Sequence, residues 1–463
     1  MSLFRASPTM IALLVASAYF MENLDGSAIT IVLPQIAGTF HVTASAASLG
    51  VTAYMVSQAI FLVMSAWAAD RFGPRNAFCW AIALFSVMSL ACAFCPNFTV
   101  FVAVRIVQGA AAAFMSPVGR VVVLRTAPKN ELIRAFGITI WPGLIAPIIG
   151  QPIGGVIATY ATWQWIFVLN VPLGIIGIAL LLMFIDNQAL AQRRPLDITG
   201  FMLTAVSLAA LLFGLDLLTH AEVNVPAAVL LLVAGVVFGV LAIRRASRHH
   251  SPLIDTTLAA IRNFAYTSIT GGTFFRVAMG AAPFLLPLLF QLGFGMTAFA
   301  ASLMMLGYAG GNLIMKSMTT GIIRRFGFRR ILVVNGVLVT VSMLTFVFAT
   351  PVVPIAIIIG FLIFAGLTRS LQFTALNTLA FADIHQESMS NASAMHAMVQ
   401  QIAFALGIAL GSVILSLSST IRGAPIGIPD FQVAFLFATA AIAVSLPWML
   451  RLTADAGEHL RRA

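Results

Sequence analysis

The sequence predicts an all-α protein that crosses a membrane many times. Hydrophobic residues make up 60% of the chain and charged residues 8%, whereas soluble domains carry about 25% charged residues. The long apolar runs lack the alternation of polar and apolar residues that strands of a membrane β-barrel show. Cationic residues concentrate in every second connection between these runs, as in multi-pass helical proteins.

A bilayer core takes about 20 apolar residues per helix, and the chain divides into fourteen such runs. We expect membrane-spanning helices at residues 9–37, 47–68, 76–95, 98–124, 133–160, 163–185, 199–218, 225–243, 264–291, 297–318, 330–350, 353–381, 391–417 and 431–450. An even number of spans puts the two chain ends on the same side of the membrane.

The positions of Arg and Lys define that side. Nearly all the cations outside the spans fall in one alternating set of connections or in the terminal segments, and Arg422 stands nearly alone in the opposite set. By the positive-inside rule, the basic connections and both termini are cytoplasmic. The formal charge of +11 is then a topology signal, so nucleic-acid binding is not expected.

A short repeat divides the chain. "ADRFGPR" at 69–75 returns as "IRRFGFR" at 323–329, each after the second helix of a six-helix set. Two parallel halves of this kind are a common transporter plan, with the substrate site at mid-membrane between them. We therefore expect a six-helix bundle at residues 1–198, two added helices and a cytoplasmic linker at 199–262, and a second six-helix bundle at 263–463.

Four motifs carry a family resemblance. They are "LDGSAITIVLP" in the first span, "AWAADRFGPR" after the second, "RIVQGAAAAFMSP" in the fourth and "GLIAPIIGQPIGG" in the fifth. Together they resemble the major facilitator superfamily, specifically its fourteen-helix drug:proton antiporters. The resemblance implies the major facilitator fold, with Asp25 as the acidic residue of the first motif and Arg105 as the membrane-embedded arginine of the third.

The same resemblance implies roles for charged residues of the loop after the second span and for small residues of the fifth span. It makes a gating loop of Asp70, Arg71, Gly73 and Arg75. It also implies close helix packing at the exporter motif, through Gly150, Pro152, Gly154 and Gly155. The chain departs from the family where Ala66 and Ala68 replace Gly and Leu, and where Gln151 follows Gly150 in place of Pro.

Charged residues deep in the spans are the candidate chemistry, because each costs roughly 3 kcal/mol on insertion scales. Glu22 and Asp25 share one helix face at i and i+3, and helix rise allows Arg105 to approach Asp25. Two acids on one buried face ionise reluctantly together, which suits a proton-coupling site made of Asp25, Glu22 and Arg105. The alternative is a permanent ion pair that only fixes helix packing.

The second half carries opposite charge. The repeat offset of about 254 residues makes Arg276 the equivalent of Glu22 in the second half, and Arg369 lies deep in a later span. We expect a substrate cavity lined by Glu22, Asp25, Arg276, Arg369 and Gln400, with an acidic and a basic wall. Such walls suit an anionic or zwitterionic substrate, or a basic residue that neutralises the acids of the empty cavity. Lys316 is expected near a helix end, where its amine reaches the interface.

These features favour secondary active transport: a proton-coupled antiporter that exports drugs or amphiphilic small molecules by alternating access. The alternatives are an exporter or uptake carrier for an organic acid or other metabolite, and a non-transporting membrane sensor. No nucleotide-binding loop, metal motif or nucleophile elbow is found in the sequence, so we expect no enzymatic activity, cofactor or metal. The expected partners are the substrate, protons and lipid, for a monomer in a bacterial inner (cytoplasmic) membrane.

Overall fold

The computed structural model describes residues 8–42, 44–126, 160–186, 196–218, 225–249, 255–385, 388–458 and 460, with short pieces between 138 and 157. All regular elements in these ranges are helices. Ten are long and apolar enough to cross a membrane, or 11 if one bent pair counts as a span. The total of fourteen helices, the cytoplasmic termini and the three domain ranges stay predictions.

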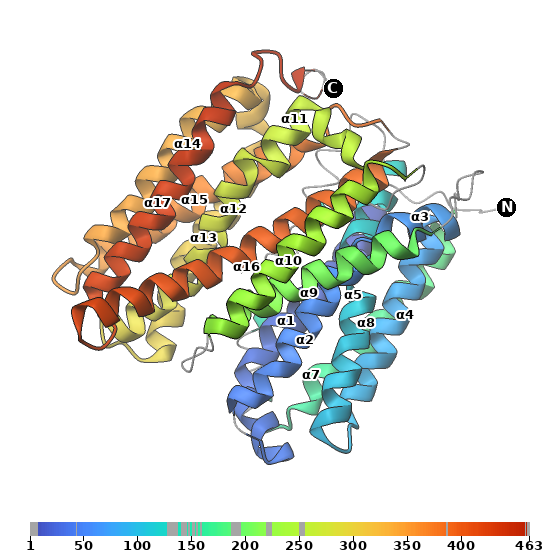
Figure 1. Cartoon of the computed structure of the whole chain (residues 1–463), viewed down its shortest axis with the longest axis horizontal. Coiled ribbons are helices and arrows are strands. Elements are labelled where there is room, and N and C mark those ends of the chain that lie inside the picture. The colour runs from blue at the N-terminus through green and yellow to red at the C-terminus, as the bar shows by residue number, and fades with distance from the viewer. Residues whose placement is uncertain are drawn as a thin grey trace. The chain divides into compact units, whose positions relative to one another are not determined.

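The chain forms two compact units. Unit 1 comprises Met1–Phe213, Val233–Asp255 and Gln386–Met398, and unit 2 comprises Gly214–Leu232, Thr256–His385 and Val399–Ala463. Figure 1 labels the helices that build them. The first helices, largely unit 1, are α1 (Pro8–Phe40), α2 (Ala44–Leu62), α3 (Ser65–Phe72), α4 (Pro74–Ala93), α5 (Phe98–Thr126), α7 (Gln164–Val168), α8 (Asn170–Phe184), α9 (Ile198–Leu217) and α10 (Val225–Ala246).

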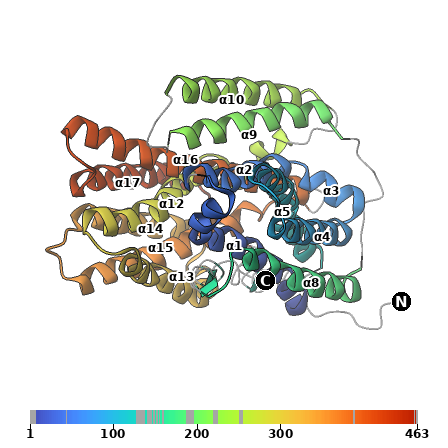
Figure 2. The ribbon, with the colours of Figure 1, turned by 90° about the horizontal axis from the view of Figure 1, so that it is seen from below.

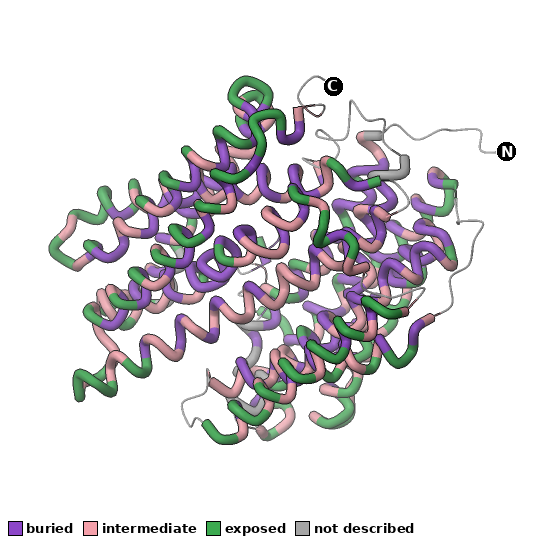
Figure 3. Tube along the Cα trace, turned by 45° about the horizontal axis from the view of Figure 1, so that its top comes forward, coloured by how far each residue is buried: buried purple, intermediate pink, exposed green. Residues whose placement is uncertain are grey.

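The later helices form most of unit 2. They are η1 (Thr256–Ala260), α11 (Arg262–Phe264), η2 (Ala265–Ile269), α12 (Gly271–Leu288), η3 (Leu289–Gly293), α13 (Ala298–Phe326), α14 (Phe328–Thr345), η4 (Phe346–Phe348), α15 (Ile355–Ala380), α16 (Met389–Arg422) and α17 (Ile428–Leu450). Along single helices, buried positions alternate with exposed ones (Figure 3), as expected of helices packed on one side only.

The sequence repeat has a structural counterpart in two tight corners. Gly73 joins α3 to α4 with φ of 82°, and Gly327 joins α13 to α14 with φ of 78°. L-residues with a side chain rarely adopt this conformation, so both corners favour glycine. The shared "RFG" therefore encodes one geometry: a helix that ends at phenylalanine, turns at glycine and restarts at the next residue.

The span predicted at 47–68 is not one straight helix. It consists of α2 and α3, and the axes of Leu49–Leu62 and Ser65–Phe72 differ by 55°. Neither Pro nor Gly stands at the break, where Val63 and Met64 form a turn. Hydropathy therefore predicted the span but gave no sign of its bend.

The span predicted at 297–318 is too short. α13 continues to Phe326, so Lys316 lies ten residues before its end, about 15 Å along the axis. The expectation that Lys316 reaches the interface is wrong, because its Nζ donates to Thr374 Oγ1 of α15 at 2.8 Å. Hydropathy drops where polar residues begin, whereas backbone hydrogen bonding continues the helix beyond that point.

The helices α9 and α10, predicted as additions to the two bundles, run side by side (Figure 2). Ser207 Oγ of α9 donates to the Gly235 carbonyl of α10 at 2.7 Å. At a second contact, Arg245 Nη2 lies 2.8 Å from Asp197 Oδ1. The Gly200 N–H donates to the same oxygen at 2.9 Å, so Asp197 also caps the start of α9. One helix start and one helix end are thus joined by a single carboxylate.

Candidate functional site

Asp25 lies in the middle of α1 and is 1% exposed. Its Oδ2 accepts a hydrogen bond from Arg105 Nη1 of α5 at 2.7 Å, and both side chains are fully buried. Its Oδ1 accepts from Asn170 Nδ2 of α8 at 3.2 Å and from Gln108 Nε2 at 3.4 Å. A carboxylate with these donors and a guanidinium is well solvated in its ionised form.

Arg105 is held on its other sides as well. Its Nη1 also donates to Gln108 Oε1 at 2.7 Å, its Nε donates to the Gly50 carbonyl at 3.4 Å, and its guanidinium lies 4.2 Å from the centre of the Tyr54 ring. Contacts from α1, α2 and α5 therefore fix the arginine. The geometry resembles a permanent structural pair more than a site that opens to substrate.

Glu22 lies one helical turn from Asp25 but is only half-buried. Its Oε1 accepts from Gln58 Nε2 of α2 at 2.6 Å, and its Oε2 accepts from Ser116 Oγ of α5 at 2.8 Å. No ion pair to Glu22 is found among the residues that the structure describes. Both donors are neutral and both can rotate, so they fit the carboxylate and the carboxylic acid alike.

The gating loop meets the start of α16. Asp70 at the end of α3 is buried, and its Oδ1 accepts from Ser390 Oγ at 3.1 Å. Ser390 is the second residue of α16, whose first turns belong to unit 1 and whose remainder belongs to unit 2. A carboxylate is favoured at a helix N-terminus, where backbone N–H groups and the helix dipole are positive.

The other predicted loop residues have separate contacts. Arg75 Nη1 donates to the Ile185 carbonyl, directly after α8, at 3.0 Å. Gly73 supplies the corner, and Arg71 is half-buried in the last turn of α3. The loop thus joins the end of α3, the start of α4 and the end of α8.

Of the four packing residues predicted at the exporter motif, Gly150 is the one that the structure describes. A Cβ at Gly150 would overlap Ser27 Oγ of α1 and would contact Leu24 Cδ1 at 3.2 Å. At Gly150 the backbone therefore lies against α1 beside Leu24 and Ser27, and a larger residue there would force these two side chains to shift. Pro152, Gly154 and Gly155 lie outside the described residues.

Arg276 is fully buried in α12. Its Nη1 donates to the carbonyls of Thr267 at 2.9 Å and Ser268 at 3.4 Å, and its Nη2 donates to Asn377 Oδ1 of α15 at 3.0 Å. Those two carbonyls belong to the π-helical turn η2, where the predicted span 264–291 is interrupted before α12. Arg276 therefore closes a helix break, and its role in the cavity stays a prediction.

Two other cations of unit 2 are less enclosed. Arg369 and Lys316 are both half-buried, and the Arg369 guanidinium lies 5.4 Å from the centre of the Tyr308 ring. Gln400 of α16 is also half-buried. The predicted cavity includes Arg369 and Gln400 but not Lys316. The structure holds Lys316 against Thr374, on the helix that carries Arg369.

The neutral partners of the acids were missed too. Gln58, Ser116 and Asn170 come from three helices and carry no charge, and their distance in sequence from Glu22 and Asp25 reaches 145 residues. Their one signal is polarity in an apolar run, which many packing residues share. Only the packed helices show that these three residues, among the many polar residues of the spans, donate hydrogen bonds to Glu22 and Asp25.

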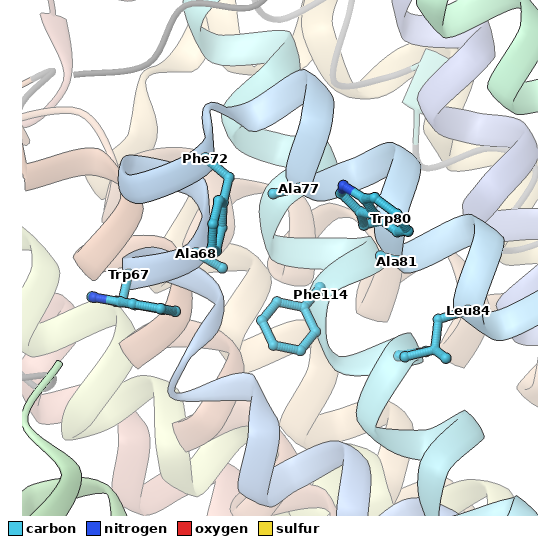
Figure 4. Close-up of a pocket in the computed structure, with 9 residues that line it drawn as sticks. Trp67, Ala68, Phe72, Ala77, Trp80, Ala81, Leu84 and Phe114 are labelled. Atoms are coloured by element: carbon cyan, nitrogen blue, oxygen red, sulfur yellow. The ribbon is translucent and has the colours of Figure 1, made fainter. Parts of the chain in front are cut away.

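Unit 1 also has an apolar hollow of about 430 Å³. Figure 4 shows it between α3, α4 and α5, where the aromatic rings of Trp67, Phe72 and Phe114 gather and the Trp80 ring lies at the edge. Trp80 is 72% exposed. None of its lining residues is ionisable and none is a predicted site residue, so the hollow is unsuited to the proton chemistry.

Comparisons with known proteins agree with this architecture. The family model described as Major Facilitator Superfamily matches residues 15–408. A "Probable transport protein HsrA" from Haemophilus influenzae is 32% identical over 98% of this chain and 97% of its own. A "Putative multidrug resistance protein MdtD" from Citrobacter koseri is 32% identical over 87% of this chain and 85% of its own.

Solved structures show the same fold at low sequence identity. The proton:xylose symporter XylE has a TM-score of 0.68 at 13% identity and covers 98% of both chains. The human organic anion transporter MFSD10 has a TM-score of 0.64 at 12% identity, with 96% of this chain and 98% of that chain covered. The chain belongs to the Major Facilitator Superfamily and is a multi-pass membrane transporter, not an enzyme.

Proposed function

We propose that this transporter is a proton-coupled antiporter that exports drugs or other amphiphilic small molecules across a bacterial inner membrane, with Glu22 as the group that binds and releases the proton. The observation that carries the proposal is the half-buried Glu22 carboxylate, whose two hydrogen bonds come from neutral donors. The names of the relatives HsrA and MdtD, as transport and multidrug resistance proteins, support the substrate class.

Asp25 has a different part in this proposal. Its ion pair with Arg105 and its donors Asn170 and Gln108 stabilise the ionised form, so protonation would leave a buried guanidinium without its counter-charge. Removing one partner of a buried pair costs about 3–5 kcal/mol. Asp25 and Arg105 thus hold α1 against α5 while Glu22 titrates one turn away.

The cytoplasmic gate completes the cycle. The bond from Ser390 Oγ to Asp70 fastens the first turns of α16 to α3, and α16 then continues into unit 2. Alternating access requires contacts that form in one state and break in the other. A hydrogen bond such as that from Ser390 contributes little enough net free energy to break and re-form in each cycle.

Proton flux driven by the addition of ethidium to proteoliposomes tests the role of Glu22. Addition of ethidium to vesicles that hold a pH-sensitive dye is expected to move protons in the wild type, and Glu22→Gln is expected to reduce that flux more than tenfold. Gln is similar in size and retains hydrogen bonds to Gln58 and Ser116, so the protein should still fold. Gly26→Ala, on the same helix with no atom within 4 Å of the new Cβ, is the matched control. Unchanged flux in Glu22→Gln would contradict the proposal.

A further inference from the structure

Two cations lie together in unit 2 without a carboxylate. Lys316 of α13 and Arg369 of α15 lie on the facing sides of two packed helices. Lys316 Nζ donates to Thr374, five residues after Arg369 on α15, and the Arg369 guanidinium lies 5.4 Å from the centre of the Tyr308 ring of α13. Neither forms an ion pair with any residue that the structure describes, and the one hydrogen bond found for Lys316 goes to the neutral Thr374. Like charges side by side inside an apolar bundle are costly, and such groups mark substrate pathways.

The helix pair that carries them is rigid. A Cβ at Gly366 would overlap the Tyr308 carbonyl oxygen, and a Cβ at Gly311 would overlap that of Ile363. Ser370 Oγ also donates to the Asn312 carbonyl at 3.0 Å. Because α13 and α15 are in backbone contact, the two cations cannot move apart by separation of their helices.

Two polar atoms beside these cations lack an acceptor. Arg369 Nε and the Tyr308 hydroxyl are buried and have no hydrogen-bond partner among the described residues, although Arg369 lies over the Tyr308 ring at 5.4 Å. Buried donors normally find partners. Arg369 and Tyr308 therefore offer two buried donors without an acceptor, and Lys316 lies two helical turns after Tyr308 on α13. An acceptor with negative charge would satisfy donors of this kind.

The surroundings describe the rest of the ligand. Phe373 lies one helical turn after Arg369 and stacks on Phe404 of α16, with ring centres 6.4 Å apart. Both rings are half-buried, as are Lys316 and Arg369, whereas Arg276 is sealed. A half-buried arginine one turn from a half-buried aromatic pair matches a molecule with a charged end and an aromatic body.

We propose that Lys316 and Arg369, with the Tyr308 hydroxyl, bind the carboxylate or sulfonate of an aromatic organic anion, and that this anion is a transported substrate. The guanidinium provides the paired donors that suit a carboxylate, and the ammonium adds a point charge. The inference rests on the proposed transport function, but it concerns the substrate site and not the proton site.

Binding to the purified full-length protein in detergent tests this site. The probes share one ring system: 2-naphthoate, the neutral 2-naphthamide and the cation 2-naphthylmethylammonium. Calorimetric titration is expected to show binding of 2-naphthoate at least tenfold tighter than that of the other two. Lys316→Gln and Arg369→Gln are each expected to weaken 2-naphthoate binding at least tenfold and to leave 2-naphthamide unchanged.

The controls separate charge from fold. Lys316→Arg keeps the charge and should retain binding within about threefold, whereas Arg325→Gln changes an exposed cation of the same helix and should have no effect. Equal binding of all three probes, or wild-type 2-naphthoate affinity in both Gln variants, would overturn the inference. Competition by chloride alone at equal concentration would do so as well, since the aromatic body would then be irrelevant.

The two proposals fail in different ways. 2-Naphthoate binding is measured without a proton gradient, so it should persist in Glu22→Gln. If the anion site is absent but ethidium still drives a proton flux, only the substrate inference is refuted. Anion binding in a protein that moves no protons would refute only the antiport.

Discussion

The helix pairs α2–α5 of unit 1 and α13–α15 of unit 2 have the same backbone packing. A Cβ at Gly109 would overlap the Tyr54 carbonyl oxygen, as a Cβ at Gly366 would overlap that of Tyr308. The two tyrosines are separated by the same 254 residues as the corner glycines Gly73 and Gly327. The repeat therefore extends from a loop signature into the helix contacts of both units.

The charges on the two pairs differ. An arginine lies over each tyrosine ring, at 4.2 Å in unit 1 and 5.4 Å in unit 2. However, Arg105 precedes its glycine by four residues, whereas Arg369 follows its glycine by three. Arg105 has the Asp25 carboxylate at 2.7 Å. Arg369 forms no ion pair with a described residue, and Lys316 is bonded to Thr374, five residues further along the Arg369 helix. The two helix pairs thus share their backbone packing. They differ in charge, because Arg105 is paired with Asp25 and Arg369 has no carboxylate partner among the described residues.

The largest expected effect is the difference in stability between a variant that lacks Arg105 and one that lacks Arg369. Arg105→Met leaves Asp25 buried without its counter-charge and should lower the free energy of unfolding by about 3–5 kcal/mol. Arg369→Met removes a cation without such a carboxylate partner and should leave stability unchanged or raise it. Unfolding in mixed micelles with rising detergent denaturant measures both variants. Equal losses would mean that Arg369 is as firmly paired as Arg105, and the contrast between the units would fail.

The next effect tests the shared packing. Gly109→Ala and Gly366→Ala should each destabilise the protein by about 1–3 kcal/mol, because the added methyl group forces the helix backbones apart. Gly310→Ala is the control on α13, where a Cβ meets no atom within 4 Å. The same unfolding measurement applies. If Gly366→Ala behaves like Gly310→Ala, the two pairs are not packed alike.

The smallest effect concerns an ion pair at the ends of two candidate spans, between Asp197 before α9 and Arg245 in the last turn of α10. Burial raises the pKa of Asp197, but the hydrogen bonds from Arg245 and from the Gly200 N–H outweigh it and lower the pKa below its usual value. The stabilisation is therefore complete above the unfolded pKa of about 3.9 and is lost as the pH falls through the lower folded value.

Asp197→Asn keeps a side-chain oxygen as the helix cap and loses the charge. Because Arg245 is 34% exposed, the loss at pH 7 should stay below about 1 kcal/mol. Unfolding curves between pH 3 and pH 7 should show a smaller acid loss in the variant than in the wild type. An effect as large as that of Arg105→Met would show that exposure does not separate the two Asp–Arg pairs.

Sequence reasoning found the groups that are rare in membranes and missed those that are common. Charge in an apolar run marked Asp25 and Arg105, and helix rise allowed their contact before the structure gave 2.7 Å. Gln58 and Ser116 gave no comparable signal, because neutral polar residues occur in many spans. The sequence therefore left open which of the two acids carries the proton, since the donors to Glu22 are known only from the assembled helices.

Helix ends were predicted less well than spans for a related reason. Hydropathy indicates which part of a helix lies in the apolar bilayer, whereas the helix itself continues as long as its backbone hydrogen bonds do. α13 outlasts its apolar segment by eight residues, which put Lys316 at the wrong depth. The break before α12 was hidden as well, since the apolar run continues through η2.

The buried Arg276 has a consequence for how the protein is made. Two of its acceptors, the carbonyls of Thr267 and Ser268, lie only nine and eight residues away on the same segment. Asn377 follows 101 residues later, about 5–20 s at common rates of synthesis. The segment thus enters the bilayer with its own solvation for the guanidinium, which reduces the cost of inserting an arginine before the rest of its bundle exists.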